Sequence, residues 1–440
     1  MGRSRKASRS NSWLTALVAD EKGEIFELEG YAAVGMAGET RRPLRQRDTI
    51  PLPYGSEIMY LPDRFPLLYN PAADLLETVS ENPYRPGTSL HPVAAFNSPG
   101  YVISHHCAYA ERPHARTLPL FSYGAAGWGA DGFRSAAILV DDEPRQDLRR
   151  MQPEAVSRGV ARMRKRLPSN RLRRHLETCA LTYGCPAGKN FFLKRYEAPL
   201  PTSRRCNARC LGCISLQSDR ELVSSQNRIA FTPDPEEIAD VALTHLSKVA
   251  HAVVSFGQGC EGDPLLANEV IEPAIRLIRS KTDRGTINMN TNGSRPRTAA
   301  RLFEAGLDSM RISINSLREP CYDAYFRPGD YSFADVTATI DLGLEYGRWV
   351  SINYLNCPGV SDAPEEQKAL TAFIEKHPLD MIQWRNLNFD PQRYHRIMGA
   401  AAPLGPALGM RQLIDGIHRR FPRLRRGYFN PPKEKWNRSQ

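Results

Sequence analysis

The chain lacks the features that would place it in a membrane or in an oxidising compartment. No window approaches the ~20 uninterrupted apolar residues that a membrane helix requires. The N-terminal segment, MGRSRKASRSNSW, has no apolar core of the kind that a secretory signal contains. The nine cysteines are odd in number and irregularly spaced over 440 residues, which argues against a disulfide framework. We therefore expect a cytoplasmic protein whose cysteines serve thiol or metal chemistry.

Cysteines at metal-ligand spacing occur in one short stretch, PTSRRCNARCLGCISLQ. It places Cys206, Cys210 and Cys213 within eight residues. A structural zinc site usually takes four protein ligands from paired Cys-x-x-Cys knuckles, and no second knuckle exists here. Thiolates also suit iron-sulfur clusters. Three protein ligands to a four-iron cluster would leave one iron open to a substrate or a cofactor.

Positive charge is unevenly distributed along the chain. The net charge is +11, and residues 145–174 carry eleven Lys and Arg against two acidic residues. Residues 411–440 carry nine Lys and Arg against two acidic residues. Such segments can follow the phosphates of nucleic acid or of an anionic substrate. The structural alternative is a solvated helix face.

The pattern of apolar runs divides the chain into five parts. Residues 1–12 are polar and basic and read as a disordered tail. Residues 13–142 contain short apolar runs between Pro and Gly, which predicts a β-rich or mixed α+β module whose role the sequence does not reveal. Residues 143–186 form a basic helical connector, residues 187–400 form a barrel, and residues 401–440 form a basic C-terminal helix and tail.

The barrel is expected because strand-like and helical stretches alternate six times. The first strand falls in FFLKRYEAPLP, residues 191–201, and the last in MIQWRNLN, residues 381–388. Six strand-then-helix units call for parallel strands with right-handed crossovers, hence an α/β fold with a partial (β/α)6 barrel. In such folds chemistry gathers at the carboxyl ends of the strands. The polar motifs of this segment fall at those ends.

The CNARCLGC segment resembles the Cys-x-x-x-Cys-x-x-Cys signature of the radical S-adenosylmethionine (radical SAM) enzymes, and it follows the first barrel strand as it does in that family. The resemblance implies that Cys206, Cys210 and Cys213 are the catalytic metal ligands of a 4Fe-4S cluster, whose unique iron chelates the amino and carboxyl groups of SAM. An electron from an external donor such as flavodoxin or ferredoxin would cleave SAM to methionine and a 5′-deoxyadenosyl radical. That radical would abstract a hydrogen atom from the substrate.

Three further segments resemble SAM-binding segments of the same family. SFGQGCEGDPLL, residues 255–266, is similar to the Gly-Gly-Glu-Pro segment that receives the SAM amino group, with aspartate in place of glutamate. NTNG, residues 290–293, and RISINS, residues 311–316, are similar to segments that face the SAM carboxylate and ribose. The cofactor-binding residues that the resemblance implies are Gly262, Asp263, Thr291, Asn292, Ser313 and Asn315, with Glu261 as a reserve for Asp263.

Strand alternation adds two residues to this set. Asn353 and Arg385 would point toward the barrel mouth, where an arginine can bind a carboxylate, and Trp384 would face the helix layer. In the family the residue before the third cysteine is often aromatic and stacks near the adenine. Here it is Gly212, so the adenine would be held by Leu211, Ile214 or the backbone.

The remaining cysteines carry weaker signals. Cys260 reads as a buried small residue, with a catalytic thiol or an extra metal ligand as alternatives. Because no cysteine follows Cys357, an auxiliary cluster could use only Cys179 and Cys185, with Cys107 as a third ligand. His105, His106 and Cys107 themselves read as packing or turn residues.

Two classes of function stay open at this point. The first is a radical SAM enzyme acting on an unidentified substrate, which could be an anionic small molecule, a peptide or RNA. The second is a zinc-containing nucleic-acid-binding protein without radical chemistry, which the basic segments would serve. The two classes differ in their metal content, since the first requires iron and labile sulfide and the second a single zinc.

Overall fold

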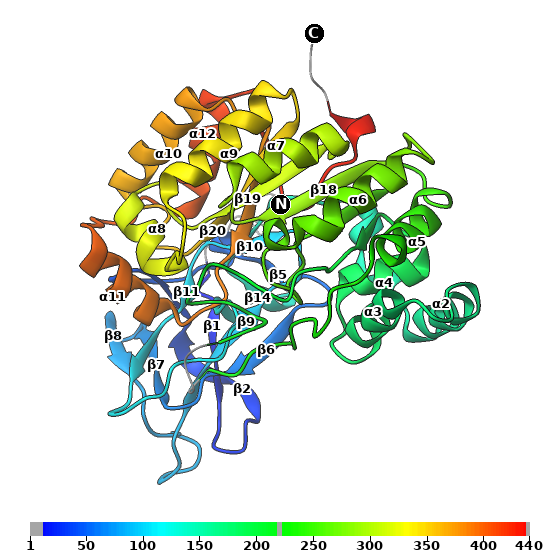
Figure 1. Cartoon of the computed structure of the whole chain (residues 1–440). Coiled ribbons are helices and arrows are strands. Elements are labelled where there is room, and N and C mark those ends of the chain that lie inside the picture. The colour runs from blue at the N-terminus through cyan, green and yellow to red at the C-terminus, as the bar shows by residue number, and fades with distance from the viewer. Residues whose placement is uncertain (1–11, 218–221, 437–440) are drawn as a thin grey trace, which may run out of the picture.

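An antiparallel module begins the chain (Figure 1). The computed structural model describes residues 12–217 and 222–436, so residues 1–11 of the expected tail lie outside the described residues. Within those ranges thirteen strands join one sheet, with a main path of β12-β7-β2-β1-β9-β13-β11-β3-β4, and β10 pairs with β15 in a second sheet. The predicted β-rich module is therefore present. Its strands are β1 (Thr15–Ala19), β2 (Ile25–Ala32), β3 (Val34–Ala37), β4 (Thr40–Pro43), β5 (Ile50–Pro51), β6 (Glu57–Tyr60), β7 (Arg64–Asn70), β8 (Leu75–Thr78), β9 (His91–Phe96), β10 (Tyr101–Ile103), β11 (His106–Cys107), β12 (Tyr109–Glu111), β13 (Gly124–Gly129), β14 (Gly132–Ser135) and β15 (Ala137–Leu139).

The basic connector folds into three helices, α2 (Pro153–Arg166), α3 (Arg171–Leu181) and α4 (Pro186–Leu193). Several of its cations are held by carboxylates of the same protein. Arg173 donates to Glu177 at 2.6 Å, and Arg171 donates to Glu237 at 2.6 Å. Arg164 also pairs with Glu177. Part of this positive charge therefore stabilises helix packing, which agrees with the structural alternative for the basic run.

A curled parallel sheet with the order β16-β17-β18-β19-β20-β21-β22 follows. All of its strands except the last are largely buried on both faces, as parallel strands under a helix layer are. The strands are β16 (Glu197–Pro199), β17 (Val253–Phe256), β18 (Thr286–Thr291), β19 (Ser309–Ile314), β20 (Trp349–Asn356), β21 (Met381–Asn386) and β22 (Arg425–Gly427). The helices are α5 (Pro235–Leu246), α6 (Asn268–Arg279), α7 (Pro296–Ala305), α8 (Glu319–Phe326), α9 (Phe333–Glu345), α10 (Pro364–Lys376), α11 (Pro391–Ala401) and α12 (Met410–Arg420).

Two expected boundaries of the barrel were wrong. The stretch read as the first strand begins inside α4, which ends at Lys194 in the left-handed conformation (φ 55°), so that β16 starts only at Glu197. The barrel also does not end at residue 400. The chain returns from α12 as β22, which pairs in parallel with β21 through Met381 and Arg425. Residues 425–427 have the sequence Arg-Arg-Gly and contain no apolar side chain, so they give no strand signal. This strand lies at the sheet edge, where two of its three residues are exposed.

The concave face of the sheet carries polar side chains. Ser255, Asn288 and Ser309 are register partners on successive strands, and Asn288 bonds to both hydroxyls at 3.2 and 2.8 Å. Asn430, beyond β22, donates to Glu197 of β16 at 2.9 Å and accepts from Gln383 of β21 at 2.8 Å. Because strands at opposite ends of the sheet meet at one side chain, the sheet must curl around a polar interior.

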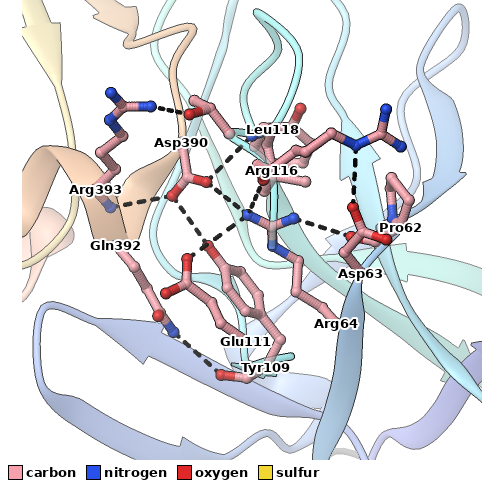
Figure 2. Close-up of polar contacts among 12 residues, drawn as sticks. Pro62, Asp63, Arg64, Tyr109, Glu111, Arg116, Leu118, Asp390, Gln392 and Arg393 are labelled. Atoms are coloured by element: carbon pink, nitrogen blue, oxygen red, sulfur yellow. Dashed lines mark hydrogen bonds and ion pairs between the residues drawn. The ribbon is translucent and has the colours of Figure 1, made fainter. Parts of the chain in front are cut away.

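The N-terminal module is fixed to the barrel by a buried ion pair, shown in Figure 2. Arg64 donates to Asp390 at 2.9 Å, and both side chains are 1% exposed. Tyr109 and the backbone N–H of Leu118 also donate to this carboxylate, at 3.3 and 3.2 Å. Asp390 in turn accepts from the N–H of Arg393 and so caps α11. One carboxylate therefore joins the module, the barrel and a helix start.

Further contacts place the module over the carboxyl ends of the last strands. Asn386, at the end of β21, donates to the carbonyl of Tyr101 at 3.0 Å and accepts from the N–H of Ile103 at 2.9 Å. His106 lies 3.3 Å from the thiol of Cys357, which follows β20. The module therefore covers one side of the barrel mouth. Within the described residues, no helix is long and apolar enough to cross a membrane.

Candidate functional site

The three signature cysteines lie on the loop between β16 and α5, at the carboxyl end of the first barrel strand. The loop is tied to the C-terminal end of α8, because the backbone N–H groups of Arg209 and Leu211 donate to α8 carbonyls at 2.9 and 3.0 Å. The thiols of Cys206, Cys210 and Cys213 are partly buried and free of disulfides. The structure therefore brings the three predicted ligands together on one anchored loop.

The distances between these thiols help to distinguish a single zinc ion from an iron-sulfur cluster. Zinc bound at about 2.3 Å from each sulfur requires thiolates about 3.8 Å apart. Among the described His, Cys, Asp and Glu residues, the one group of three whose ligand atoms all lie within 4.8 Å of one another is His175, Cys179 and Cys260. Cys206, Cys210 and Cys213 form no such group, so at least one of their sulfur–sulfur distances exceeds 4.8 Å. A distance of that size fits a cluster of several irons better than a single ion.

Burial raises the pKa of two of the three thiols on this loop. It raises the pKa of Cys206 to about 12 and the pKa of Cys210 well above the usual value. A metal ligand must lose its proton, so the metal itself has to stabilise these thiolates. Arg228 donates to the sulfur of Cys213 at 3.7 Å, a contact that sequence reasoning missed. Its position, fifteen residues after Cys213, carries no motif.

Gly212 is required by its neighbours. A Cβ atom there would meet the carbonyl oxygen of Asn388 at 2.8 Å and the hydroxyl of Tyr325 at 3.0 Å. The aromatic residue that the family often has before the third cysteine would therefore collide with the end of β21 and with α8. Leu211 is buried, and Ile214 packs against the core, so both stay candidates for an adenine contact.

The glycine-rich loop after β17 is interlocked with the cysteine loop. The N–H of Gly262 donates to the carbonyl of Ser203 at 2.7 Å, and the N–H of Asp263 donates to that of Arg205 at 2.8 Å. A Cβ on Gly262 would lie 1.9 Å from the Arg205 carbonyl oxygen. The glycine thus allows the two backbones to touch directly before Cys206.

Glu261 acts as the central acceptor of these two loops. Its carboxylate accepts four backbone N–H groups, from Thr202 and Ser203 at 2.7 and 2.8 Å and from Gly257 and Gln258 at 2.7 and 2.8 Å. Burial raises its pKa to about 7 against the opposing effect of these donors. All of its oxygen contacts are internal, so Glu261 positions the loops and no longer suits the role of a reserve SAM ligand.

Asp263, Thr291 and Asn292, three of the predicted SAM contacts, lie together in the structure. Asp263 accepts from the hydroxyl of Thr291 at 2.8 Å and from the N–H of Asn292 at 2.7 Å. The Asn292 amide then donates at 2.8 Å to Asn207, the residue after the first cysteine. A continuous polar network therefore links the third strand end to the start of the cysteine signature.

The other predicted contacts divide into two groups. Ser313 and Asn353 are half-buried neighbours, 3.5 Å apart through the Asn353 amide, and the oxygen of that amide is buried without a hydrogen-bond partner. Arg385 lies over the ring of Tyr428 at 4.0 Å. Asn315 instead donates to the hydroxyl of Tyr394 at 3.0 Å and to an α8 carbonyl. The oxygen of the Asn315 amide is buried without a hydrogen-bond partner, as that of Asn353 is, so a contact of Asn315 with SAM stays a prediction.

Arg311 is a lumen cation that the sequence analysis passed over. It donates to Gln383 at 2.7 Å, it is 8% exposed, and its Nε atom has no partner. Burial and then the neighbouring charge of Arg385 lower its pKa to about 9. The buried Arg311 guanidinium with its unused donor fits a lumen that receives a polar, anionic ligand.

Trp384 faces the helix layer as predicted, since its indole donates to His418 of α12 at 3.2 Å.

The three candidates for an auxiliary cluster, Cys107, Cys179 and Cys185, do not form a group of close ligand atoms. Cys107 is packed in the core of the N-terminal module, and Cys185 stands at the N-cap position of α4. Cys179 instead lies beside Cys260 of the glycine-rich loop. The Cys260 side chain is 5% exposed. The alternative of Cys260 as an extra metal ligand is taken up below.

Comparison with known proteins also indicates a radical SAM domain. The Radical SAM superfamily model matches residues 200–369. The GTP 3′,8-cyclase of Thermodesulfovibrio yellowstonii is 27% identical over 192 residues, which are 41% of this chain and 56% of that protein. Molybdenum cofactor biosynthesis protein 1 of Mus musculus is 24% identical over 229 residues, which are 50% of this chain and 32% of that protein.

The structure of native anSMEcpe with bound AdoMet has a TM-score of 0.33 at 17% identity, and the match covers 44% of this chain and 51% of that one. The chain spans about half the length of the first cyclase relatives that it matches. The matched region holds the cysteine loop, the glycine-rich loop and the ends of β18, β19 and β20. Residues 200–369 of this chain are a radical SAM superfamily domain.

Proposed function

We propose that the protein is an enzyme that cleaves SAM reductively with a 4Fe-4S cluster held by Cys206, Cys210 and Cys213. The observation that carries the proposal is the wide-spaced trio of thiols on one anchored loop at the carboxyl end of the first strand. When bound, the cluster and SAM supply a 5′-deoxyadenosyl radical, which abstracts a hydrogen atom from the substrate. The superfamily match over residues 200–369 supports this reading.

The chain's own residues would bind SAM and exclude water. We propose that Gly262, Asp263, Thr291 and Asn292 shape the wall that receives the methionine part of SAM, since their network adjoins the cysteine loop. Ser313 and Asn353 would face SAM or the substrate from the lumen, because the Asn353 oxygen has no protein partner. The N-terminal module would keep bulk water from the mouth, which protects a radical from side reactions.

Removal of one cysteine tests this proposal. Cys206→Ala is expected to lose the brown chromophore after anaerobic reconstitution, with at least a tenfold fall in iron and labile sulfide. Cys107→Ala is the matched control, because that cysteine is buried in the N-terminal module, away from the loop. Iron retained by Cys206→Ala at the wild-type level, or lost equally in Cys107→Ala, would contradict the assignment.

We further propose that the substrate carries an anionic group held by Arg311 and Arg385. The supporting observations are the unpartnered Nε of Arg311 and the position of both cations at the polar interior. GTP is a suitable probe, since the cyclase relatives are named for it. An RNA substrate would also satisfy these cations, and it would show a much steeper salt dependence.

Arg385→Ala is expected to weaken GTP binding by about tenfold to a hundredfold, since a charged hydrogen bond contributes roughly 1.5–3 kcal/mol. Arg423→Ala removes the same charge from an exposed position and should leave binding unchanged. Calorimetry on the reconstituted protein measures both. Equal affinities in the two variants would exclude the lumen as the anion site.

The proposal also includes an external reductant, such as flavodoxin or ferredoxin, and a cytoplasmic location, which the nine unpaired cysteines favour. The alternative, a zinc-containing nucleic-acid-binding protein, is less well supported. At least one sulfur–sulfur distance in the signature exceeds 4.8 Å, which is longer than the spacing that one zinc ion takes, and part of the basic connector is paired with acidic side chains.

A further inference from the structure

A second group of soft ligands lies outside the cysteine signature. His175 and Cys179 are four residues apart on α3 and therefore project from the same face of the helix. Cys260 reaches them from the loop after β17. The ligand atoms of all three residues lie within 4.8 Å of one another, and the His175 Nε2 atom is 3.6 Å from the Cys179 sulfur.

This spacing suits a single metal ion. Zinc binds thiolates at about 2.3 Å and imidazole nitrogen at about 2.0–2.1 Å, so neighbouring ligand atoms of a tetrahedral site lie roughly 3.5–3.8 Å apart. The observed group meets that requirement after small side-chain adjustments. Two thiolates and one imidazole are the ligands that zinc prefers among protein side chains.

The backbone around the group is already ordered. The carbonyl of Cys260 accepts from the N–H of Ile229 at 2.8 Å, and the carbonyl of Cys179 accepts from the N–H of Cys185 at 2.9 Å. The His175 ring packs edge-on against Phe231, with centroids 6.4 Å apart. Cys179 and Cys260 are 2% and 5% exposed, whereas His175 is half-buried. The two thiols are thus held in place, and solvent can reach the site past the histidine.

We propose that His175, Cys179 and Cys260 bind one Zn²⁺ ion, with a water molecule as the fourth ligand. On binding, each thiol that is still protonated releases its proton to solvent. Cys185, at the N-cap position of α4, is not included, because it is not part of the group whose ligand atoms all lie within 4.8 Å of one another. This inference does not rest on the proposed SAM chemistry, since none of the three residues belongs to the cysteine signature.

The position of the ion gives it a structural role. Cys260 is followed directly by Glu261, the acceptor that joins the glycine-rich loop to the backbone before Cys206. An ion at this place would fix α3 of the connector to that loop. The connector would then support the SAM-side loops from outside the barrel. With three protein ligands and a water the site keeps one open position, whereas purely structural zinc sites have four protein ligands.

Zinc analysis of the full-length wild-type protein tests the inference. We expect about one equivalent of zinc per chain, and zinc-edge X-ray absorption should report two sulfur and two lighter neighbours. Absorption at the zinc edge does not detect the iron of a cluster. Zinc should persist in a Cys206→Ala, Cys210→Ala, Cys213→Ala variant, which separates this site from the proposed function.

Variants of the site complete the test. Cys179→Ser with Cys260→Ser should lose the zinc, and Cys321→Ser, a buried cysteine elsewhere in the barrel, should keep it. Circular dichroism shows whether each variant is folded, and Co²⁺ binding to the wild type serves if the double variant is not. The inference fails if the wild type takes up neither metal stoichiometrically, if the folded double variant keeps its zinc, or if anaerobically purified wild type contains a Cys179–Cys260 disulfide.

Discussion

Gly262→Ala is expected to disrupt the cluster loop. The new Cβ would lie 1.9 Å from the backbone carbonyl oxygen of Arg205. Because the colliding atom belongs to the backbone, no side-chain rotation can relieve the contact. We expect a loss of about 3 kcal/mol or more in the free energy of unfolding, at the upper end of overpacking effects.

The displaced segment leads directly into Cys206, so iron and labile sulfide should also fall at least tenfold after reconstitution. Gly416→Ala provides the control. It lies inside α12, and its added Cβ would come no closer than 3.9 Å to Gln367. That change should be neutral or stabilising by roughly 0.4–1 kcal/mol. Urea unfolding and iron analysis of both variants would reveal the difference, and equal behaviour would show that the two loops do not touch as described.

Asp390→Ala is expected to loosen the N-terminal module from the barrel. Arg64 would stay buried at 1% exposure with its principal counter-charge removed, and α11 would lose its cap. Breaking one partner of a buried ion pair costs roughly 3–5 kcal/mol. We therefore expect a loss of that size in the free energy of unfolding, together with early proteolytic cleavage between module and barrel.

Two controls distinguish the buried pair from ordinary charge effects. Glu365→Ala removes one partner of the exposed Glu365–Lys368 pair, 2.8 Å long, and should cost less than about 0.5 kcal/mol. Replacing both buried partners, Arg64→Met with Asp390→Leu, should recover much of the loss, because no isolated charge is left behind. A cost for Asp390→Ala no larger than that for Glu365→Ala would contradict the role of this carboxylate.

The parts of the site with local sequence signals could be predicted. Cys206, Cys210 and Cys213 stand at a fixed spacing, and the alternation of strands and helices shows that their loop follows a barrel strand. The contact of Asp263 with Thr291 follows from the same rule, because adjacent parallel strands bring their carboxyl ends together. Trp384 could be assigned to the helix layer from strand alternation alone.

Features that depend on distant pairing could not be predicted. Asn430 meets Glu197 across 233 residues, and Arg64 meets Asp390 across 326. Neither pair has a local pattern. Asn315 was predicted to contact SAM because it lies in a motif. Its amide nitrogen donates to Tyr394 and to an α8 carbonyl, contacts that the motif did not indicate. Motif position gives the backbone location of a residue, whereas the direction of its side chain depends on which helices pack nearby.

The central claim, that this barrel cleaves SAM at a cluster on the Cys206–Cys213 loop, is tested most directly by product analysis. Wild-type protein is reconstituted without oxygen, reduced with dithionite and incubated with SAM, and the products are measured by mass spectrometry. The account predicts 5′-deoxyadenosine and methionine from the wild type and neither from Cys206→Ala. A wild-type protein that carries its full complement of iron and sulfide and leaves SAM intact would contradict it.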